Sequence, residues 1–331
     1  MDTNSIISQI GNTPLVKLKQ PSELTGCHIY GKAEYFNPGE SVKDRAALFI
    51  VQDAFKRKLI SKGGTIVEGT AGNTGIGLAI VCKEYDLKLK IVIPKTQSIE
   101  KKETLRKLGA ELIEVEAVPY ANPLNYIKQS KKIAEDLNKT NSNGVYWANQ
   151  FDNIVNSEAH IQGTAEEIWS QTAGTVDGFT CSVGTGGTLA GVSIGLKNKK
   201  KDIKIALSDP MGSALYSHLK NNKLESTGSS ITEGIGNGRI TKNFDKALID
   251  DAFQTDDVEA LNLVYDLVEK QKIILGGSSG INIAGAIKLA KKMGPGKTIV
   301  TILCDHGKRY ASKIFNKEFL KSKDLPIPKW L

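Results

Sequence analysis

One lysine follows a proline-glycine turn in the stretch "NPGESVKDRAALF", residues 37–49. Ser41 is a good helix N-cap, and Asp44 three residues later completes a Ser-x-x-Asp capping-box pattern. Lys43 would then lie in the first helical turn, where the helix dipole disfavours an ammonium, next to the apolar run 46–51. Both effects favour the neutral amine that Schiff-base chemistry requires. Taken alone, the segment also fits an ordinary surface lysine at a helix start.

Two glycine-rich turns could bind anions. In "EGTAGNTGIGLAIV", 68–81, a strand leads into a loop that exposes backbone N–H groups at a helix start, which suits a carboxylate or a phosphate. "SVGTGGTLAGV", 182–192, repeats this design and could surround a phosphate dianion. The alternative for the first loop is tight helix-strand packing without a ligand. The candidate donors are Thr70, Gly72, Asn73 and Thr74 in the first loop, and Gly184, Thr185, Gly186, Gly187 and Thr188 in the second.

A nucleotide site competes with this interpretation. Asp209 ends the next predicted strand, about where a ribose-binding acid belongs in a dinucleotide fold. However, Leu189 occupies the third glycine position of the Gly-x-Gly-x-x-Gly fingerprint, and no Gly-Lys-Ser/Thr follows any of these turns. A nicotinamide oxidoreductase therefore has little support.

A further glycine-rich element, "ILGGSSGINIAGA" at 274–286, puts Ser278 at the start of a helix of small residues. A capping serine is the simpler interpretation of this element alone. Together, the four elements supply a nucleophilic lysine, a carboxylate loop, a phosphate loop and a hydroxyl. This combination predicts a site for pyridoxal phosphate.

Short β-branched runs alternate with helical patterns, which predicts an α/β fold with mainly parallel sheets. We expect strands at 65–67, 89–93, 112–115, 145–148, 178–183, 203–207 and 298–303. We expect helices at 41–56, 74–86, 98–108, 124–137, 156–170, 187–197, 256–270 and 280–292. Residues 116–124 and 221–243 are the longest irregular stretches, a feature that is often functional.

Composition excludes several classes of protein. The net charge is +8, but the lysines and arginines are scattered and aromatic residues do not interleave with them, so nucleic-acid binding has no support. The sequence predicts no membrane-spanning helix, no secretion signal and no zinc site. Four well-separated cysteines (Cys27, Cys82, Cys181 and Cys304) are typical of reduced thiols in a cytoplasmic protein.

The motifs closely resemble those of the cysteine synthase (O-acetylserine sulfhydrylase) and cystathionine β-synthase family. "IGNTPLVKL", "NPGESVKDR", "EGTAGNTGIGLA", "VGTGGT", "EGIGNGRI", "GGSSG" and "DHGKRY" follow one another in family order from residue 10 to 310. The resemblance implies the fold type II, tryptophan synthase β-like architecture, with the cofactor in the cleft between two domains. We place a smaller substrate domain at 37–150 and a larger phosphate-binding domain at 1–36 plus 151–331.

The resemblance also implies residue roles. Lys43 would form the internal aldimine and shuttle the substrate proton, Ser278 would accept the pyridine nitrogen, and Asn73 would contact the ring hydroxyl. Gly184 to Thr188 would bind the phosphate, and Gly234 would face the substrate side of the cofactor. The substrate carboxylate would be held by the loop Thr70, Ala71, Gly72, Asn73 and Thr74 together with Gln150.

The expected reaction converts O-acetyl-L-serine and sulfide to L-cysteine and acetate through an aminoacrylate. A neutral hydroxyl at Ser278 stabilises no pyridinium, which favours β-elimination and addition over transamination. Sibling activities stay open: phosphoserine sulfhydrylase, cystathionine β-synthase, cysteine desulfhydrase and cyanoalanine synthase. The family also implies a homodimer and, as an alternative role, binding of the C-terminal peptide of serine acetyltransferase.

Three positions depart from the family pattern. Ala71 stands where many cysteine synthases have serine, and His306 stands where serine is frequent. Arg239 replaces an apolar residue in the loop after "EGIG". We hypothesise that Arg239 reaches the mouth of the site and favours an anionic group on the substrate or the attacking thiol; a surface arginine is the simpler alternative.

Overall fold

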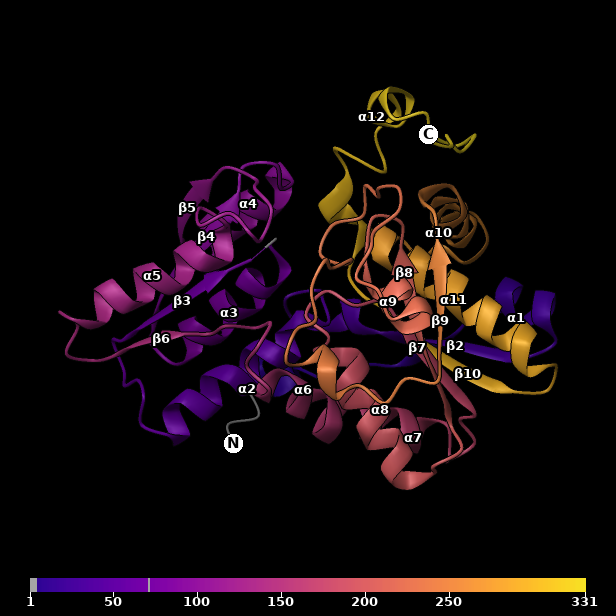
Figure 1. Ribbon diagram of the computed structural model, residues 1–331, viewed down its shortest axis with the longest axis horizontal. Helices are drawn as coiled ribbons and strands as arrows, with labels where there is room; N and C mark the ends of the chain where they lie inside the picture. Colours follow the sequence, from indigo (N-terminus) through magenta and orange to yellow (C-terminus); the bar gives the residue numbers. More distant parts are fainter. Residues whose placement is uncertain (1–4, 71) are drawn as a thin grey trace.

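The computed structural model describes residues 5–70 and 72–331, which form two sheets (Figure 1). The larger sheet has six strands in the order β1-β2-β10-β7-β8-β9, and the smaller has four in the order β5-β4-β3-β6. Every pairing in both sheets is parallel except that of β1 with β2. The predicted α/β class with mainly parallel sheets is confirmed.

All seven predicted strands are present. The strands are β1 Leu15–Lys17, β2 His28–Ala33, β3 Thr65–Gly69, β4 Lys88–Pro94, β5 Glu111–Val115, β6 Val145–Trp147, β7 Gly178–Cys181, β8 Lys204–Pro210, β9 Asp251–Thr255 and β10 Thr298–Leu303. The sequence missed β1, β2 and β9. Of these, β1 and β9 are edge strands, so they lack the continuous apolar run of a central parallel strand.

The predicted helices also form, with three short additions, α1, α9 and α12. The helices are α1 Lys19–Thr25, α2 Lys43–Lys56, α3 Asn73–Glu84, α4 Ile99–Lys107, α5 Tyr126–Asn138, α6 Val155–Ala159, α7 Glu166–Gln171, α8 Gly187–Lys199, α9 Leu215–Asn221, α10 Asp257–Gln271, α11 Gly277–Met293 and α12 Lys317–Ser322. The single helix predicted at 156–170 is interrupted by a π-helical segment, His160–Ala165. Such segments are rare and often mark functional sites.

The start of α2 corrects the capping-box prediction. The cap position is Val42, which makes no side-chain cap, while the Ser41 hydroxyl accepts from the Lys43 N–H at 3.3 Å. Asp44 turns to the preceding turn instead, where it accepts from the Gly39 N–H. Burial raises the pKa of Asp44 to about 7, against the opposing effects of the Gly39 N–H and Arg309. Lys43 is nevertheless the first helical residue, as the sequence indicates.

The sheets divide the chain unevenly (Figure 1). Residues 65–147 supply the whole four-stranded sheet, and the six-stranded sheet takes strands from both sides of that segment. Helices α3 and α11 are buried nearly all round because parallel sheets are covered on both faces. The domain limits at 37 and 150 stay a prediction. Within 5–70 and 72–331, no helix is long and apolar enough to cross a membrane.

Candidate active-site cleft

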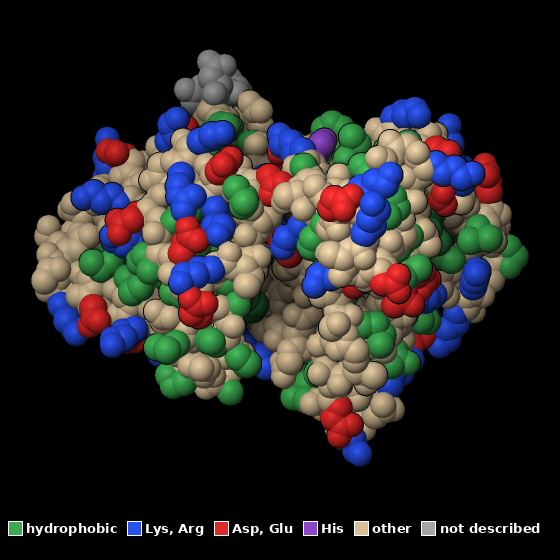
Figure 2. All heavy atoms as spheres, turned by 90° about the horizontal axis from the view of Figure 1, so that it is seen from above, with side chains coloured by type: hydrophobic (Ala, Val, Ile, Leu, Met, Phe, Trp, Pro, Cys, Tyr) green, Lys and Arg blue, Asp and Glu red, His purple; other side chains and the backbone are tan. Residues whose placement is uncertain are grey.

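A cavity of about 500 Å³ lies between the two halves, and Figure 2 shows the surface hollowed between them. Loops after β3 and β7 open into it, at the carboxyl ends of parallel strands where α/β proteins bind ligands. Ten of the predicted site residues line this cavity: Lys43, Thr70, Gly72, Asn73, Thr74, Gln150, Gly184, Thr185, Gly234 and Ser278. Residues far apart in sequence are therefore gathered at one place.

Three predicted residues of the phosphate loop do not line this cavity, and one predicted residue of the 70–74 loop lies outside the described residues. Gly186 and Thr188 line a small adjoining pocket that also contains Lys43. Gly187 lines neither space, because the direction of its missing side chain is filled by Asn156, whose Oδ1 would lie 2.1 Å from an added Cβ. Ala71 lies outside the described residues.

Lys43 is the first residue of α2, and its side chain lines both the cavity and the small adjoining pocket. The N–H of Val42 donates to the carbonyl of Cys304 at 2.9 Å, which ties the helix start to the end of β10. Ser278, in the first turn of α11, lines the same cavity and is buried. An amine and a neutral hydroxyl therefore face one cavity from two different helices.

The loop at 184–188 is shaped by close backbone packing. An added Cβ at Gly184 would meet the Gly234 carbonyl oxygen at 2.2 Å, and Gly186 has a φ of 90° that glycine tolerates. Asn156 Nδ2 donates to Thr185 Oγ1 at 3.0 Å and fixes that side chain. The loop precedes the 13-residue helix α8, whose N-terminal N–H groups suit a phosphate dianion. The glycine cradle and this donor set fit a phosphate group.

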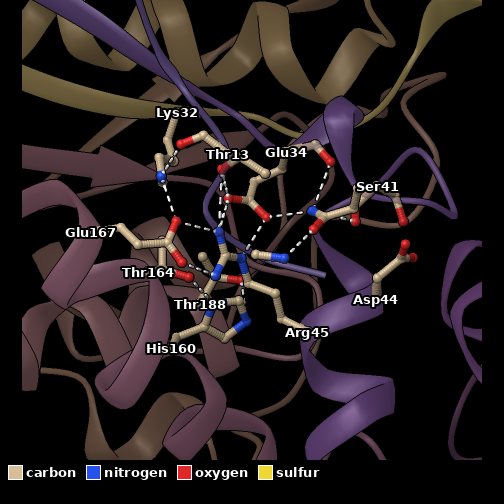
Figure 3. Close-up of polar contacts among 12 residues, drawn as sticks. Thr13, Lys32, Glu34, Ser41, Asp44, Arg45, His160, Thr164, Glu167 and Thr188 are labelled. Carbon is tan, nitrogen blue, oxygen red and sulfur yellow. Dashed lines mark hydrogen bonds and ion pairs between the residues drawn. The ribbon is translucent and has the colours of Figure 1, made fainter. Parts of the chain in front are cut away.

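A buried histidine contacts the same loop, and the sequence did not reveal it. His160 Nε2 lies 3.2 Å from Thr188 Oγ1, and His160 Nδ1 lies 2.9 Å from Thr164 Oγ1 (Figure 3). Burial, assisted by the charge of Arg45, lowers the pKa of His160 to about 3, so the ring is neutral. His160 and Thr164 both belong to the π-helical segment, and His160 links Thr164 to Thr188.

The predicted carboxylate-binding side chains are paired with one another. Thr74 Oγ1 donates to Gln150 Oε1 at 2.6 Å, and Gln150 Nε2 donates to Glu68 Oε1 at 3.1 Å. The Thr70 hydroxyl accepts from the Gly72 N–H at 3.1 Å. A substrate carboxylate would therefore have to replace the hydrogen bond between Thr74 and Gln150. The role of these residues in binding the carboxylate stays a prediction.

Glu68, the fourth residue of β3, is fully buried behind Gln150, and this predicts a pH effect. Burial raises the pKa of Glu68 to about 8, although the Gln150 amide and backbone N–H groups lower it. Between about pH 4.5 and pH 8 the folded state then holds a proton that the unfolded state releases, so the free energy of unfolding falls as pH rises. Glu68→Gln should reduce this slope by the share of one carboxyl, up to about 1.4 kcal/mol per pH unit. Urea unfolding across the window measures it, and equal slopes in wild type and variant would exclude Glu68 as the source.

The other residues of interest have structural roles. Asp209 Oδ2 accepts from the Tyr216 N–H at 2.8 Å at the start of α9, and Asp209 lines neither the cavity nor the small adjoining pocket. His306 caps a 3-10 turn by accepting from the Lys308 N–H at 3.1 Å. All four cysteines are free, and burial raises the pKa of Cys304, which lines the cleft, to about 11. The described part of the chain contains no cluster of side chains that could hold a metal ion.

Arg239 lines the mouth of the cleft, together with Tyr120 and Phe151. Its two Nη atoms donate to the Asp152 carboxylate at 3.1 and 3.0 Å, and its guanidinium carbon lies 4.5 Å from the centre of the Tyr120 ring. Tyr120 comes from the irregular stretch at 116–124, which sequence reasoning marked without assigning a residue. The guanidinium charge is thus already paired with a carboxylate.

Comparisons with known proteins agree with this geometry. The sequence profile of the family described as "Pyridoxal-phosphate dependent enzyme" matches residues 6–305. Cysteine synthase 1 of Neurospora crassa is 50% identical over 321 residues, covering 96% of this chain and 84% of the relative. Cysteine synthase of Dictyostelium discoideum is 43% identical, covering 98% and 87%. The crystal structure of O-acetylserine dependent cystathionine beta-synthase from Helicobacter pylori superposes with a TM-score of 0.85 at 33% identity, covering 95% of this chain and 98% of that one.

Proposed function

The chain belongs to the pyridoxal-phosphate dependent enzyme family, and we propose that it acts as a cysteine synthase, which replaces the acetate of O-acetyl-L-serine with sulfide. The observation that carries this proposal is the meeting of Lys43, the 184–188 loop, Ser278 and the 70–74 loop at one cleft. Each of these elements fits one part of pyridoxal phosphate or of an amino-acid substrate.

We propose that Lys43, Asn73, Ser278 and the loop Gly184 to Thr188 hold the cofactor. When bound, pyridoxal phosphate supplies an electron-withdrawing ring that makes the substrate Cα proton acidic. The Lys43 amine takes that proton as the Cβ–O bond breaks and acetate leaves; sulfide then bonds to Cβ, and Lys43 returns a proton to Cα. The neutral Ser278 hydroxyl favours this loss of a group from Cβ over transamination.

The loop at 70–74 and Gln150 would orient the substrate by its carboxylate. The N–H groups at the start of α3 and the hydroxyl of Thr74 are suitable donors once Thr74 exchanges Gln150 for the substrate. Gly234, which also lines the cavity, leaves room for the amino acid because nothing lies within 4 Å of its missing side chain.

The visible absorbance spectrum of the purified protein tests this proposal. We expect a yellow band from the bound cofactor that moves to longer wavelength when O-acetylserine is added without sulfide, and cysteine when sulfide follows. A band that does not move when acetylserine is added would support the cofactor assignment and contradict acetylserine as the substrate. A protein that stays colourless with added pyridoxal phosphate would overturn the proposal.

Partners and compartment are also part of the proposal. We infer a homodimer and a cytoplasmic enzyme from the family resemblance and the four free cysteines. The same 70–74 loop could accept the C-terminal carboxylate of serine acetyltransferase. Inhibition by a peptide ending in isoleucine tests that role, and sedimentation measures the oligomeric state.

The Asp152–Arg239 pair gives a prediction about substrate charge. Because Asp152 neutralises the guanidinium, we expect Arg239→Ala to change the rate on O-phosphoserine relative to O-acetylserine only slightly. Asp152→Asn frees the cation and should raise this ratio about fivefold, since a partly exposed charge contributes roughly 1 kcal/mol. Measured kcat/KM values for both substrates decide this. An unchanged ratio in Asp152→Asn would show that Arg239 does not select anionic groups even when its charge is not neutralised by Asp152.

A further inference from the structure

Asn73, the first residue of α3, is held by two charged residues that follow β10. Arg309 Nη1 donates to Asn73 Oδ1 at 2.8 Å, and Asn73 Nδ2 donates to Asp305 Oδ2 at 2.6 Å. Arg309 is 4% exposed and Asp305 is 1% exposed. Asn73 belongs to the half with the four-stranded sheet, while Asp305 and Arg309 belong to the other half. The two contacts therefore join the halves beside the cleft.

The charges decide which way the Asn73 amide faces. The two ends of an asparagine amide have nearly the same shape, but a guanidinium only donates hydrogen bonds and a carboxylate only accepts them. The reverse orientation would place the NH₂ group against Arg309 and the carbonyl oxygen against Asp305. Both contacts would then be repulsive, so a single orientation is stable.

Both directing residues are anchored independently of Asn73. Asp305 Oδ2 also accepts from the Tyr310 hydroxyl at 2.6 Å. Arg309 Nη2 donates to the Gly39 carbonyl, and it lies 3.8 Å from Glu40 Oε2. The clamp around Asn73 is thus fixed before any ligand enters.

We propose that Arg309 and Asp305 are positioning residues that turn the Asn73 amide so that its second N–H donor is available to the cleft. Oδ1 accepts from Arg309 and is thereby held on the Arg309 side, and Nδ2 carries two hydrogens of which Asp305 takes one. Within the described residues, Asp305 is the one acceptor of Nδ2. An N–H donor stabilises a deprotonated ring oxygen, which is the contact proposed above for Asn73. This inference rests on the proposed function.

The double variant Asp305→Asn/Arg309→Gln tests the proposal. It removes both directing charges without changing the net charge, and the new amides accept either orientation of Asn73. We expect the midpoint of the pH titration of the holoenzyme's visible absorbance to rise by roughly one pH unit, because the Asn73 amide can then turn and accept from the protonated ring oxygen as well. The Kd for pyridoxal phosphate, measured after stripping and re-adding it, should rise about tenfold.

The matched control is Arg57→Gln/Asp324→Asn, which makes the same kinds of change at two exposed positions and should leave both values at those of the wild type. A wild-type protein that binds no pyridoxal phosphate would overturn the proposed function itself. A wild type that binds it, with a double variant that keeps the same midpoint and Kd, would overturn the positioning role alone. If this double variant does not fold, Asp305→Ser/Arg309→Gln carries the test, since it also replaces both directing charges with groups that donate as well as accept; an unchanged midpoint then overturns the proposal.

Discussion

Replacing Lys43 with alanine should reduce kcat/KM for cysteine formation by at least about a thousandfold, because no other amine is proposed to take the Cα proton. The variant should still fold, since Lys43 is only partly buried and its helix is fixed by the Val42–Cys304 and Ser41 contacts. It should also lose covalent attachment of the cofactor. Borohydride reduction followed by peptide mass analysis measures this attachment in the wild type and the variant.

The control for Lys43→Ala is Lys56→Ala, at the exposed last position of the same helix, which should change neither activity nor attachment. Lys43→Arg distinguishes the positive charge of Lys43 from its role as an amine, since arginine keeps a cation but offers no neutral amine. If Lys43→Ala retained activity within tenfold of the wild type, another group would have to be the base. The assignment of the cleft would then have to be revised.

The second large effect is expected at Arg45, two residues further along α2. Its guanidinium lies 2.7 Å from Glu34 Oε2 and 2.6 Å from Glu167 Oε1, while Lys32 Nζ lies 2.5 Å from Glu167 Oε2 (Figure 3). Lys32 and Glu34 are fully buried, and Arg45 is nearly so. Removing one member of such a network leaves a buried charge without compensation. Arg45→Met should therefore reduce the free energy of unfolding by about 3–5 kcal/mol.

Acid should weaken this effect of Arg45→Met. In the wild type, burial raises the pKa of Glu34, but the Arg45 guanidinium outweighs it and the net pKa is lowered. Without Arg45, the burial effect is opposed by Lys32 and by weaker hydrogen bonds such as that from Thr13, so the Glu34 carboxyl takes up a proton more readily. The loss of stability should therefore shrink as pH falls toward the ordinary pKa of glutamate. Urea unfolding at neutral and mildly acidic pH measures this trend.

Arg57→Met is the matched control for Arg45→Met, because Arg57 follows the same helix and pairs with Asp53 at 3.1 Å on the surface. An exposed pair of this kind contributes less than about 1 kcal/mol. Equal losses in the two variants would mean that the buried network stabilises no more than a surface pair does.

The sequence by itself determined the fold class, the central strands other than β2, and the candidate chemistry. Central parallel strands and buried helices depend on apolar runs that can be recognised in short segments of the sequence. The two glycine-rich turns can be recognised in the same way, because each follows a predicted strand. Lys43, the loop at 184–188 and Ser278 could therefore be proposed from short segments. Edge strands β1 and β9 could not, since their few apolar residues carry no such pattern.

The tertiary structure alone decided how side chains pair across the cleft. It bonds Thr74 to Gln150, joins Asn73 to Asp305 and Arg309, and places Asp152 against Arg239. It also turned Asp44 from the predicted cap to Gly39. These partners are separated by up to 236 positions in the chain. Hydrogen bonds act over about 3 Å in space, so their partners follow from how the two halves pack and not from spacing along the sequence.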